Sequence, residues 1–398
     1  MEKDYKKLIS KYLKDTIDST SIFDCHTHLF PPEHKNYYLS GLENILNYHY
    51  LIAELLTIAG TSTKEFYSLE HSKRANLIWD ELFQKRTPMS ESCKGVITTL
   101  NHFNISIKNK NYYEVDKELK SKNYSDKDIL NICNINSLVM TNNPFDDEEW
   151  SLFERNDWDR NIYLSSMRLD NLLNDSDSLI KKKFENNQSI ISFLEKCYNQ
   201  SKPVYAAISA STNEFKQLLK NNLWKEILTW LNNKKLPLSL MLGVKRAINK
   251  DFGLAGDGIG DIDLKDLSKL CNSHPNNKFF VTCLSLNDQH ELTVLVRKHP
   301  NLKMFGFWWF MNQPSLIEQM LKMRIDMLGL SIIPQHSDAR VTDQLIYKWS
   351  KFKKILHKVL LEYYVDLNEN NYEIDLEVIK NDISNLLNNN AKNFLNIK

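Results

Sequence analysis

Short apolar runs alternate with longer amphipathic stretches along most of this chain. In the longer stretches the apolar residues recur at helical spacing, whereas the short runs have the length and the apolar character of buried strands. Strand-like segments are predicted at 21–28, 135–141, 161–168, 203–210, 236–246, 278–285, 302–310 and 328–338, and helices between or after the later ones at 214–231, 264–271, 288–298, 314–327 and 342–363. Strands that alternate with helices pair in parallel through right-handed crossovers. The pattern therefore predicts an α/β protein, a (β/α)8 barrel of the TIM type, with its active site at the C-terminal ends of the strands.

One long stretch interrupts this alternation. Pro31 and Pro32 end the first strand, and helical spacing then continues for about a hundred residues. We therefore predict three parts, namely an N-terminal helix with the first barrel strand at 1–30, a helical insertion at 31–134, and the remainder of the barrel with a C-terminal helix at 135–398. The N-terminal helix is predicted to be an amphipathic surface helix, with an apolar stripe made of Tyr5, Leu8, Ile9, Tyr12, Leu13 and Ile17.

Composition narrows the class of protein. The chain has 398 residues, 42% of them hydrophobic and 25% charged, which is typical of a globular protein. A formal net charge of +1 gives no reason to expect a nucleic-acid or membrane partner. The first residues lack the apolar core of a signal peptide and no long apolar run follows, so we expect a cytoplasmic protein. The six cysteines are scattered and are predicted to be free thiols.

The first predicted strand carries the most specific chemical signal. Residues His26 and His28 are two apart, so in a strand both side chains point to one face, with Asp24 on the same face. Two imidazoles placed in this way can bind one metal ion. The alternative is a pair of histidines that only marks the end of a strand.

Other polar and aromatic residues follow the predicted strands and would meet at the same rim. They are Arg168 after the third strand, Arg246 after the fifth, Trp308 and Trp309 after the seventh, and Asp338 and Arg340 after the eighth. Each also has a structural interpretation: an arginine can serve an ordinary ion pair, a tryptophan can pack, and Asp338 can cap the next helix. His49 lies on an apolar helical stripe of the insertion and could be a core histidine.

Several segments taken together resemble a known family. They are Asp24-Cys25-His26-Thr27-His28, Tyr48-His49-Tyr50-Leu51, Phe305-Gly306-Phe307-Trp308-Trp309-Phe310 and Ile333-Pro334-Gln335-His336-Ser337-Asp338-Ala339-Arg340. In this order, over nearly the whole chain, they resemble the amidohydrolase superfamily and, within it, the uronate (glucuronate) isomerases. The resemblance implies interconversion of D-glucuronate with D-fructuronate, and of D-galacturonate with D-tagaturonate. It also implies one divalent metal ion, zinc being the expected one, and no organic cofactor.

The resemblance and the residue chemistry together suggest roles. His26, His28 and Asp338 would hold the metal, and His28 would also help the metal to polarise the substrate. Asp338 would be the base that moves a proton between C2 and C1 through an enediol, with Arg340 beside it and Tyr50 as proton donor. For the substrate carboxylate the candidates are Arg168, then Arg246, because arginine binds carboxylates with two parallel bonds. His49 would add a hydrogen bond, and Trp308 and Trp309 would enclose the sugar.

Two other functions are compatible with parts of the pattern. A mononuclear metal-dependent hydrolase or deaminase could use the same histidines and Asp338. The predicted fourth strand has no lysine, however, and the fifth and sixth have no histidine. The resemblance implies that two-metal hydrolases of the superfamily need these residues, and the missing histidines also argue against the mononuclear hydrolase or deaminase. A barrel retained only as a binding protein would have no reason to keep the whole polar set. The expected partner is a small uronic acid, and a homo-oligomer is compatible with a chain of this size.

Overall fold

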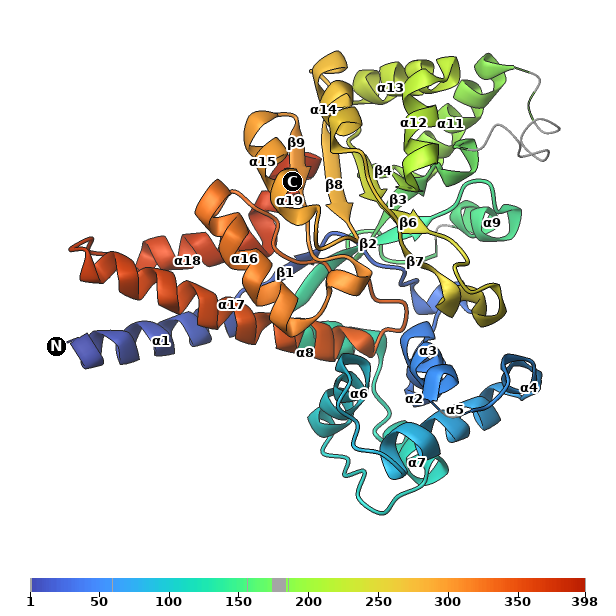
Figure 1. The fold of residues 1–398 in the computed structure, drawn as a ribbon, viewed down its shortest axis with the longest axis vertical. Helices are drawn as coiled ribbons and strands as arrows, with labels where there is room; N and C mark the ends of the chain where they lie inside the picture. The colour runs from blue at the N-terminus through green and yellow to red at the C-terminus, as the bar shows by residue number, and fades with distance from the viewer. Residues whose placement is uncertain (1, 59, 156, 174–183, 185, 398) are drawn as a thin grey trace.

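The core of the molecule is one curled sheet of seven parallel strands (Figure 1). This computed structural model describes residues 2–58, 60–155, 157–173, 184 and 186–397. The strands follow in spatial order β1-β2-β3-β4-β5-β8-β9, so strands that succeed each other around the sheet are hydrogen-bonded neighbours. Their bounds are β1 Ile22–Asp24, β2 Ile135–Asn142, β3 Tyr163–Arg168, β4 Ala206–Ala210, β5 Leu238–Leu242, β8 Phe279–Cys283 and β9 Leu302–Met304. This arrangement confirms the predicted α/β barrel of the TIM type.

The predicted eighth strand is wrong as a regular strand, although its segment does close the barrel. Residues 328–338 form a single parallel bridge, between Phe305 and Ile333, on the side of β9. On the opposite side, Asp338 N donates to His26 O over 3.1 Å and His28 N donates to Ala339 O over 2.7 Å. Gly306 lies at this closure with φ +55°, and a Cβ there would come within 1.8 Å of the His336 ring. The segment does not form a regular ladder because it must fit between the chain after β9 and the chain after β1 and also bring Asp338 to the end of the barrel.

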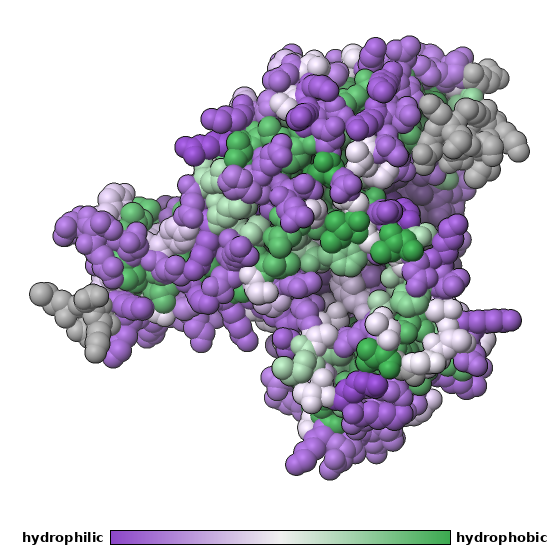
Figure 2. All heavy atoms as spheres, in the orientation of Figure 1, coloured by the Kyte–Doolittle hydropathy of each residue, from purple (hydrophilic) through white to green (hydrophobic). Residues whose placement is uncertain are grey.

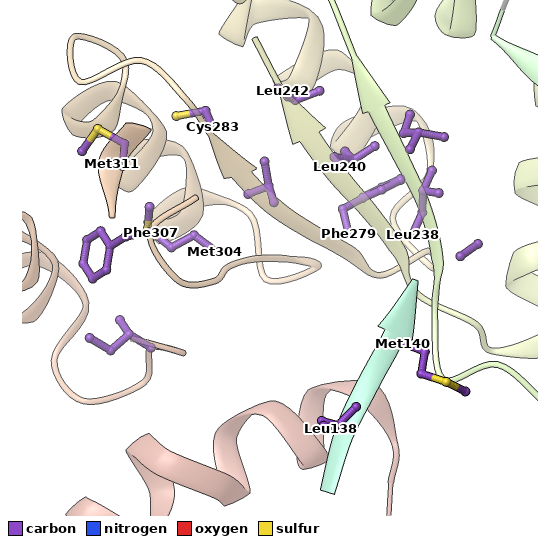
Figure 3. Packing of buried hydrophobic residues seen from close by; sticks show 14 of the residues in the cluster. Leu138, Met140, Leu238, Leu240, Leu242, Phe279, Cys283, Met304, Phe307 and Met311 are labelled. Atoms are coloured by element: carbon purple, nitrogen blue, oxygen red, sulfur yellow. The ribbon is translucent and has the colours of Figure 1, made fainter. Parts of the chain in front are cut away.

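Residues along each strand alternate between two hydrophobic clusters, as a strand buried on both faces requires. Figure 3 shows one cluster, to which β5 contributes Leu238, Leu240 and Leu242 and β8 contributes Phe279. The alternate position Met241 belongs to a second, smaller cluster inside the barrel, together with residues such as Phe23, Phe280 and Phe305. Helices cover the outer cluster, with bounds α9 Asp147–Arg155, α11 Asn187–Ser201, α12 Thr212–Lys220, α13 Asn222–Lys234, α14 Leu264–Ser273, α15 Gln289–Lys298, α16 Pro314–Leu328 and α17 Gln344–Glu369.

The helices between β1 and β2 form a body with its own core beside the barrel (Figure 1). They are α2 Leu42–Leu46, α3 His49–Ile58, α4 Thr63–Ser68, α5 His71–Trp79, a π-helix Asp80–Gln84, α6 Glu91–His102, α7 Tyr112–Ser121 and α8 Asp126–Cys133. Phe66 and Trp79 lie at the centre of this core and are fully buried. The last helix, α8, packs instead with the barrel core through Ile129 and Leu130.

The two ends of the chain pack against the same side of the barrel. Helix α1 (Glu2–Ser19) lies along α17 and buries Ile9, Leu13 and Ile17, whereas Leu8 is 56% exposed and does not belong to its apolar stripe as predicted. The predicted C-terminal helix is divided into α18 Leu376–Ser384, a π-helix Asn385–Asn389 and α19 Asn390–Leu395. Figure 2 shows hydrophilic side chains over most of one face of the molecule, with apolar ones gathered near its middle. In the described ranges, no helix combines the length and apolar character needed to span a bilayer.

Candidate active site

A cavity of about 440 Å³ opens at the C-terminal ends of the barrel strands. Such a volume is typical of a small-molecule site. Among the predicted site residues, those that line it are His26, His28, His49, Arg168, Arg246, Trp308, Trp309, Asp338 and Arg340. Tyr50 does not line the cavity, and its neighbour Tyr48 does. Residues separated by more than 300 positions thus meet in one place because each follows the end of a strand or belongs to the insertion above it.

Three of these residues form a group that could hold a metal ion. The ligand atoms of His26, His28 and Asp338 all lie within 4.8 Å of one another. Asp338 Oδ1 is 3.7 Å from His26 Nε2 and 3.4 Å from His28 Nε2. Among the described residues, His26 Nε2 and Asp338 Oδ1 are buried without a hydrogen-bond partner. Because buried polar atoms normally have partners, these lone pairs fit a bound cation.

The two histidines reach this group from a loop and not from a strand, which corrects the prediction. Strand β1 ends at Asp24, and the chain continues extended because Thr27 N donates to Val139 O of β2 over 2.9 Å. On the other side, the backbone N–H of His28 donates to Ala339 O. The chain therefore stays extended, and the side chains of His26 and His28 still share one face. Asp338 itself has φ +50°, a left-handed conformation that a side chain other than glycine adopts at some cost.

Asp24, predicted on the same face, does not join the group. Its Oδ1 accepts from Ser337 N over 3.0 Å and its Oδ2 accepts from Trp349 Nε1 over 2.9 Å. Both carboxylate oxygens therefore connect β1 to the closing segment and to α17. Its role in this structure is to hold the first strand in register with the end of the barrel.

A tyrosine that sequence reasoning missed fixes the tautomer of His26. The Tyr205 hydroxyl, fully buried, donates to Cys25 O over 3.0 Å and lies 3.0 Å from His26 Nδ1. A hydroxyl has one proton, and a carbonyl can only accept, so Tyr205 must accept from Nδ1–H. The proton of the neutral imidazole is then on Nδ1, and the Nε2 lone pair faces Asp338 and His28. Tyr205 precedes β4 in the sequence, and nothing local in the sequence indicates a partner at position 26.

Burial and neighbouring charges set the charge states of the group. Burial, reinforced by His28 and His336, lowers the pKa of His26 well below 6.5, and burial likewise lowers that of His28. Burial alone would raise the pKa of Asp338. The contact with His28, the charges that His28 and His26 carry when they are protonated, and the charge of Lys348 lower this pKa by more, so the net shift is downward. At neutral pH the group is thus two neutral imidazoles and one carboxylate. Lys348, on α17, was not predicted because it lies far from any strand end in sequence.

The arginines of the cavity differ in their partners. Arg168 Nε is 2.9 Å from Asp170 Oδ2, and Arg246 is 2.6 Å from Asp257 Oδ2. Arg340 has no carboxylate partner among the residues that the structure describes. Sequence reasoning identified the arginines and missed both aspartates, although Asp170 follows Arg168 by only two residues.

The segment after β5 departs from the predicted single strand 236–246. Gly243, with φ +85°, turns the chain after β5, and β6 (Val244–Lys245) pairs antiparallel with β7 (Gly258–Ile259). Between them the segment η4 (Lys250–Gly256) consists of 3-10 turns that are interrupted at Gly253, whose φ of +57° is not helical. This hairpin carries Arg246 and Asp257 to the cavity rim.

Aromatic side chains cover the cavity on the side of the insertion. The rings of Tyr48 and His49 are 4.1 Å apart, and His49 is 5.3 Å from Trp309. Tyr50 stacks edge-on against Tyr48 at 4.9 Å, and its hydroxyl is buried without a partner in the described part of the chain. Burial, followed by the charge of Arg340, lowers the pKa of His49 to about 3, so this imidazole is neutral at physiological pH.

Among known proteins, the structures that resemble this chain include uronate and glucuronate isomerases. No protein-family model and no curated protein matches the sequence. Among solved structures, a uronate isomerase from Bacillus halodurans C-125 is 35% identical, with a TM-score of 0.92 over 99% of this chain and 97% of the other. A uronate isomerase from Thermotoga maritima (15% identity, TM-score 0.78, 97% of each chain) and a glucuronate isomerase from Caulobacter crescentus (14%, 0.75, 98% of this chain and 94% of the other) share the fold.

Proposed function

Because this chain belongs to the uronate isomerase family of the amidohydrolase superfamily, we propose that it interconverts D-glucuronate and D-fructuronate. We extend the proposal to D-galacturonate and D-tagaturonate, whose interconversion needs the same proton transfer between C2 and C1. The observation that carries the proposal is the content of one cavity: an ionised carboxylate, Asp338, lies beside two neutral imidazoles, and arginines line the same space. A sugar acid needs both a base for its C–H bond and a cation for its carboxylate.

We propose that His26, His28 and Asp338 bind one divalent metal ion, with zinc as the first candidate. Imidazole nitrogens and a carboxylate oxygen are the donors that zinc accepts, and Tyr205 holds the His26 lone pair toward the group. A bound metal would supply Lewis-acid polarisation of a substrate oxygen. The free lone pairs described above support this assignment.

The proton transfer is assigned to residues of the chain itself. In the proposal, the Asp338 carboxylate accepts the proton from C2 and returns it to C1, and Arg340 stabilises the negative charge that develops on the enediol oxygen. Burial raises the pKa of Tyr50 well above 10, so its hydroxyl keeps its proton and can donate it toward O1, and the proton that leaves the C2 hydroxyl as its carbonyl forms returns to the tyrosine. Tyr48 lies between Tyr50 and the cavity and would pass that proton or orient a hydroxyl of the sugar.

The substrate carboxylate is assigned first to Arg168 and second to Arg246. The bond from Arg168 Nε to Asp170 orients the guanidinium, which lies in the cavity wall. Arg246 is 53% exposed at the rim, where solvent weakens its attraction. His49 would donate or accept one hydrogen bond, and Trp308 and Trp309 would exclude water from the sugar.

A hydrolase or deaminase has less support. Where β4 and β5 line the cavity, the described residues are Ala207, Ile208, Ser209 and Met241. None of these can bind a second metal ion or protonate a leaving amine. Five buried cysteines are free thiols, which supports a reducing compartment, so we propose a cytoplasmic enzyme; they are Cys25, Cys93, Cys133, Cys271 and Cys283. Light scattering of the purified protein would test the further proposal of a homo-oligomer.

A direct assay tests the proposed function. Purified protein is incubated with D-glucuronate, and ketose formation is followed with added zinc, with a chelator, and with zinc restored after the chelator. We expect turnover that the chelator lowers and zinc restores. Absence of ketose in all three conditions, together with cleavage of an amide or ester substrate, would replace the isomerase by the hydrolase.

A further inference from the structure

A second cavity lies next to the catalytic one, between the insertion and the η4 segment. Its volume is about 320 Å³. Four residues line both cavities and form the partition between them: Tyr48, His49, Leu254 and Arg340. On the far side of this partition the wall comes from the insertion helices, which Figure 1 shows beside the barrel.

The charge of this second cavity is entirely positive. Two arginines, Arg74 and Arg340, line it, and no aspartate or glutamate is among its described lining residues. His71 also lines it, but its Nδ1 is already 2.9 Å from Glu43. The catalytic cavity differs, because Arg168 and Arg246 each have an aspartate partner there.

Two nitrogen atoms at the second cavity have no hydrogen-bond partner in the described part of the chain. They are Arg74 Nε and His49 Nε2, both buried. The Arg74 guanidinium lies 5.9 Å from the centre of the Phe66 ring, which belongs to the core of the insertion. A guanidinium that rests on a fixed aromatic ring and lacks a carboxylate is already positioned for an external one.

A hydrogen bond joins the insertion to η4 beside this cavity. The hydroxyl of Tyr67, on α4, donates to Phe252 O in η4 over 2.6 Å. Tyr67 and the η4 residues Gly253, Leu254 and Ala255 line the cavity. The insertion and the hairpin after β5 therefore enclose this space together.

We propose that this second cavity is a binding site for a small oxyanion, with Arg74 and Arg340 as its cationic groups. The chemical class is a carboxylate, sulfate or phosphate, since the planar guanidinium can donate two parallel, charge-assisted hydrogen bonds to a pair of oxygens on any of them. Given the proposed function, one source of such a group is the uronate itself, captured on its way to the catalytic cavity; the other is a free inorganic anion. Arg340 lines both cavities, so an anion bound in one cavity changes the electrostatic potential in the other.

The direct test is calorimetric titration of the intact protein with inorganic sulfate. We expect Arg74→Gln to weaken sulfate binding by about tenfold or more, the loss typical of one charge-assisted hydrogen bond. Lys73→Gln is the matched control, because Lys73 is the adjacent helix residue, 59% exposed and 3.3 Å from Glu70. Equal sulfate binding by wild type and Arg74→Gln, or no binding by the wild type, would overturn the site. Thermal unfolding of each variant establishes that it is folded.

A kinetic arm distinguishes the two sources of the anion. If the site captures uronate, Arg74→Gln lowers kcat/KM, leaves kcat unchanged, and makes kcat/KM less sensitive to salt. If kcat/KM is unchanged while sulfate binding is lost, the site serves a free anion. Sulfate binding does not depend on turnover, so a protein that binds sulfate through Arg74 yet does not isomerise uronates would refute the proposed function and leave the anion site standing.

Discussion

Replacing Tyr205 by phenylalanine removes one hydroxyl and tests how the metal group is organised. That hydroxyl donates to Cys25 O and accepts from His26 Nδ1, both over 3.0 Å, in a fully buried position. Without it, the Nδ1–H is buried and unpaired. The imidazole can relieve this by moving its proton to Nε2, which removes the lone pair that faces Asp338 and His28.

The size of the effect follows from these two bonds. A buried donor left without a partner costs about 1–3 kcal/mol. Loss of a hydrogen bond that orients a metal-binding histidine typically lowers metal affinity by about 10–100-fold, or roughly 1.4–2.8 kcal/mol. We therefore expect Tyr205→Phe to bind zinc about 10–100-fold more weakly and to be about 1–3 kcal/mol less stable without metal.

Competition with a chromogenic chelator measures zinc affinity, and urea unfolding of the metal-free protein measures stability. Tyr163→Phe is a matched control, because Tyr163 is also buried and its hydroxyl donates to Asp126 Oδ2 over 2.7 Å. The control should lose stability and keep its zinc affinity. If Tyr205→Phe binds zinc within twofold of the wild type, the tautomer argument is refuted, whatever happens to its stability.

Three more predictions follow from the site. Asp338→Asn should lower kcat by at least about a hundredfold, because general-base catalysis contributes about 10²–10⁴-fold; a rate near that of the wild type would show that another group is the base. Arg168→Ala should raise KM for uronate by about tenfold or more and Arg246→Ala by less, since Arg246 is 53% exposed; the reverse order would exchange their roles. His34 is 1% exposed, both its nitrogens lack partners among the described residues, and burial lowers its pKa to about 4. Between pH 6.5 and about pH 4 the unfolded state therefore binds a proton at His34 that the folded state does not bind. The free energy of unfolding decreases as the pH is lowered through that window. His34→Leu should reduce this fall by about 1.4 kcal/mol per pH unit in urea unfolding, and an unchanged slope would refute the assignment.

Local pattern predicted most of the fold because strand and helix periods are properties of neighbouring residues. Seven of the eight predicted segments contain a strand of the sheet, including β5, which occupies only the first part of its segment. The eighth could not be predicted as irregular, since its conformation results from closing the barrel between β9 and the chain after β1. The short antiparallel hairpin of β6 and β7 was also missed, because strands of two residues leave no periodic signal.

The candidate site was predictable to the extent that its residues follow strand ends. His26, His28, Arg168 and Asp338 were found in this way, and the structure brings them to one cavity. Their catalytic roles remain predictions. Tyr48 belongs to a quoted motif but was not singled out, because nothing local in Tyr48-His49-Tyr50 indicates which of the two tyrosines faces the cavity.

The sequence by itself determined the alternation of strands and helices, and with it which polar residues would meet at the rim. Only the tertiary structure decided who their partners are. Tyr205 meets His26, and Asp24 is committed to Ser337 and Trp349 and not to a metal ion. The physical reason is that backbone periods are set by adjacent residues, whereas a hydrogen bond requires two atoms within about 3 Å of each other. For groups far apart in the chain, that distance exists only after the barrel has closed.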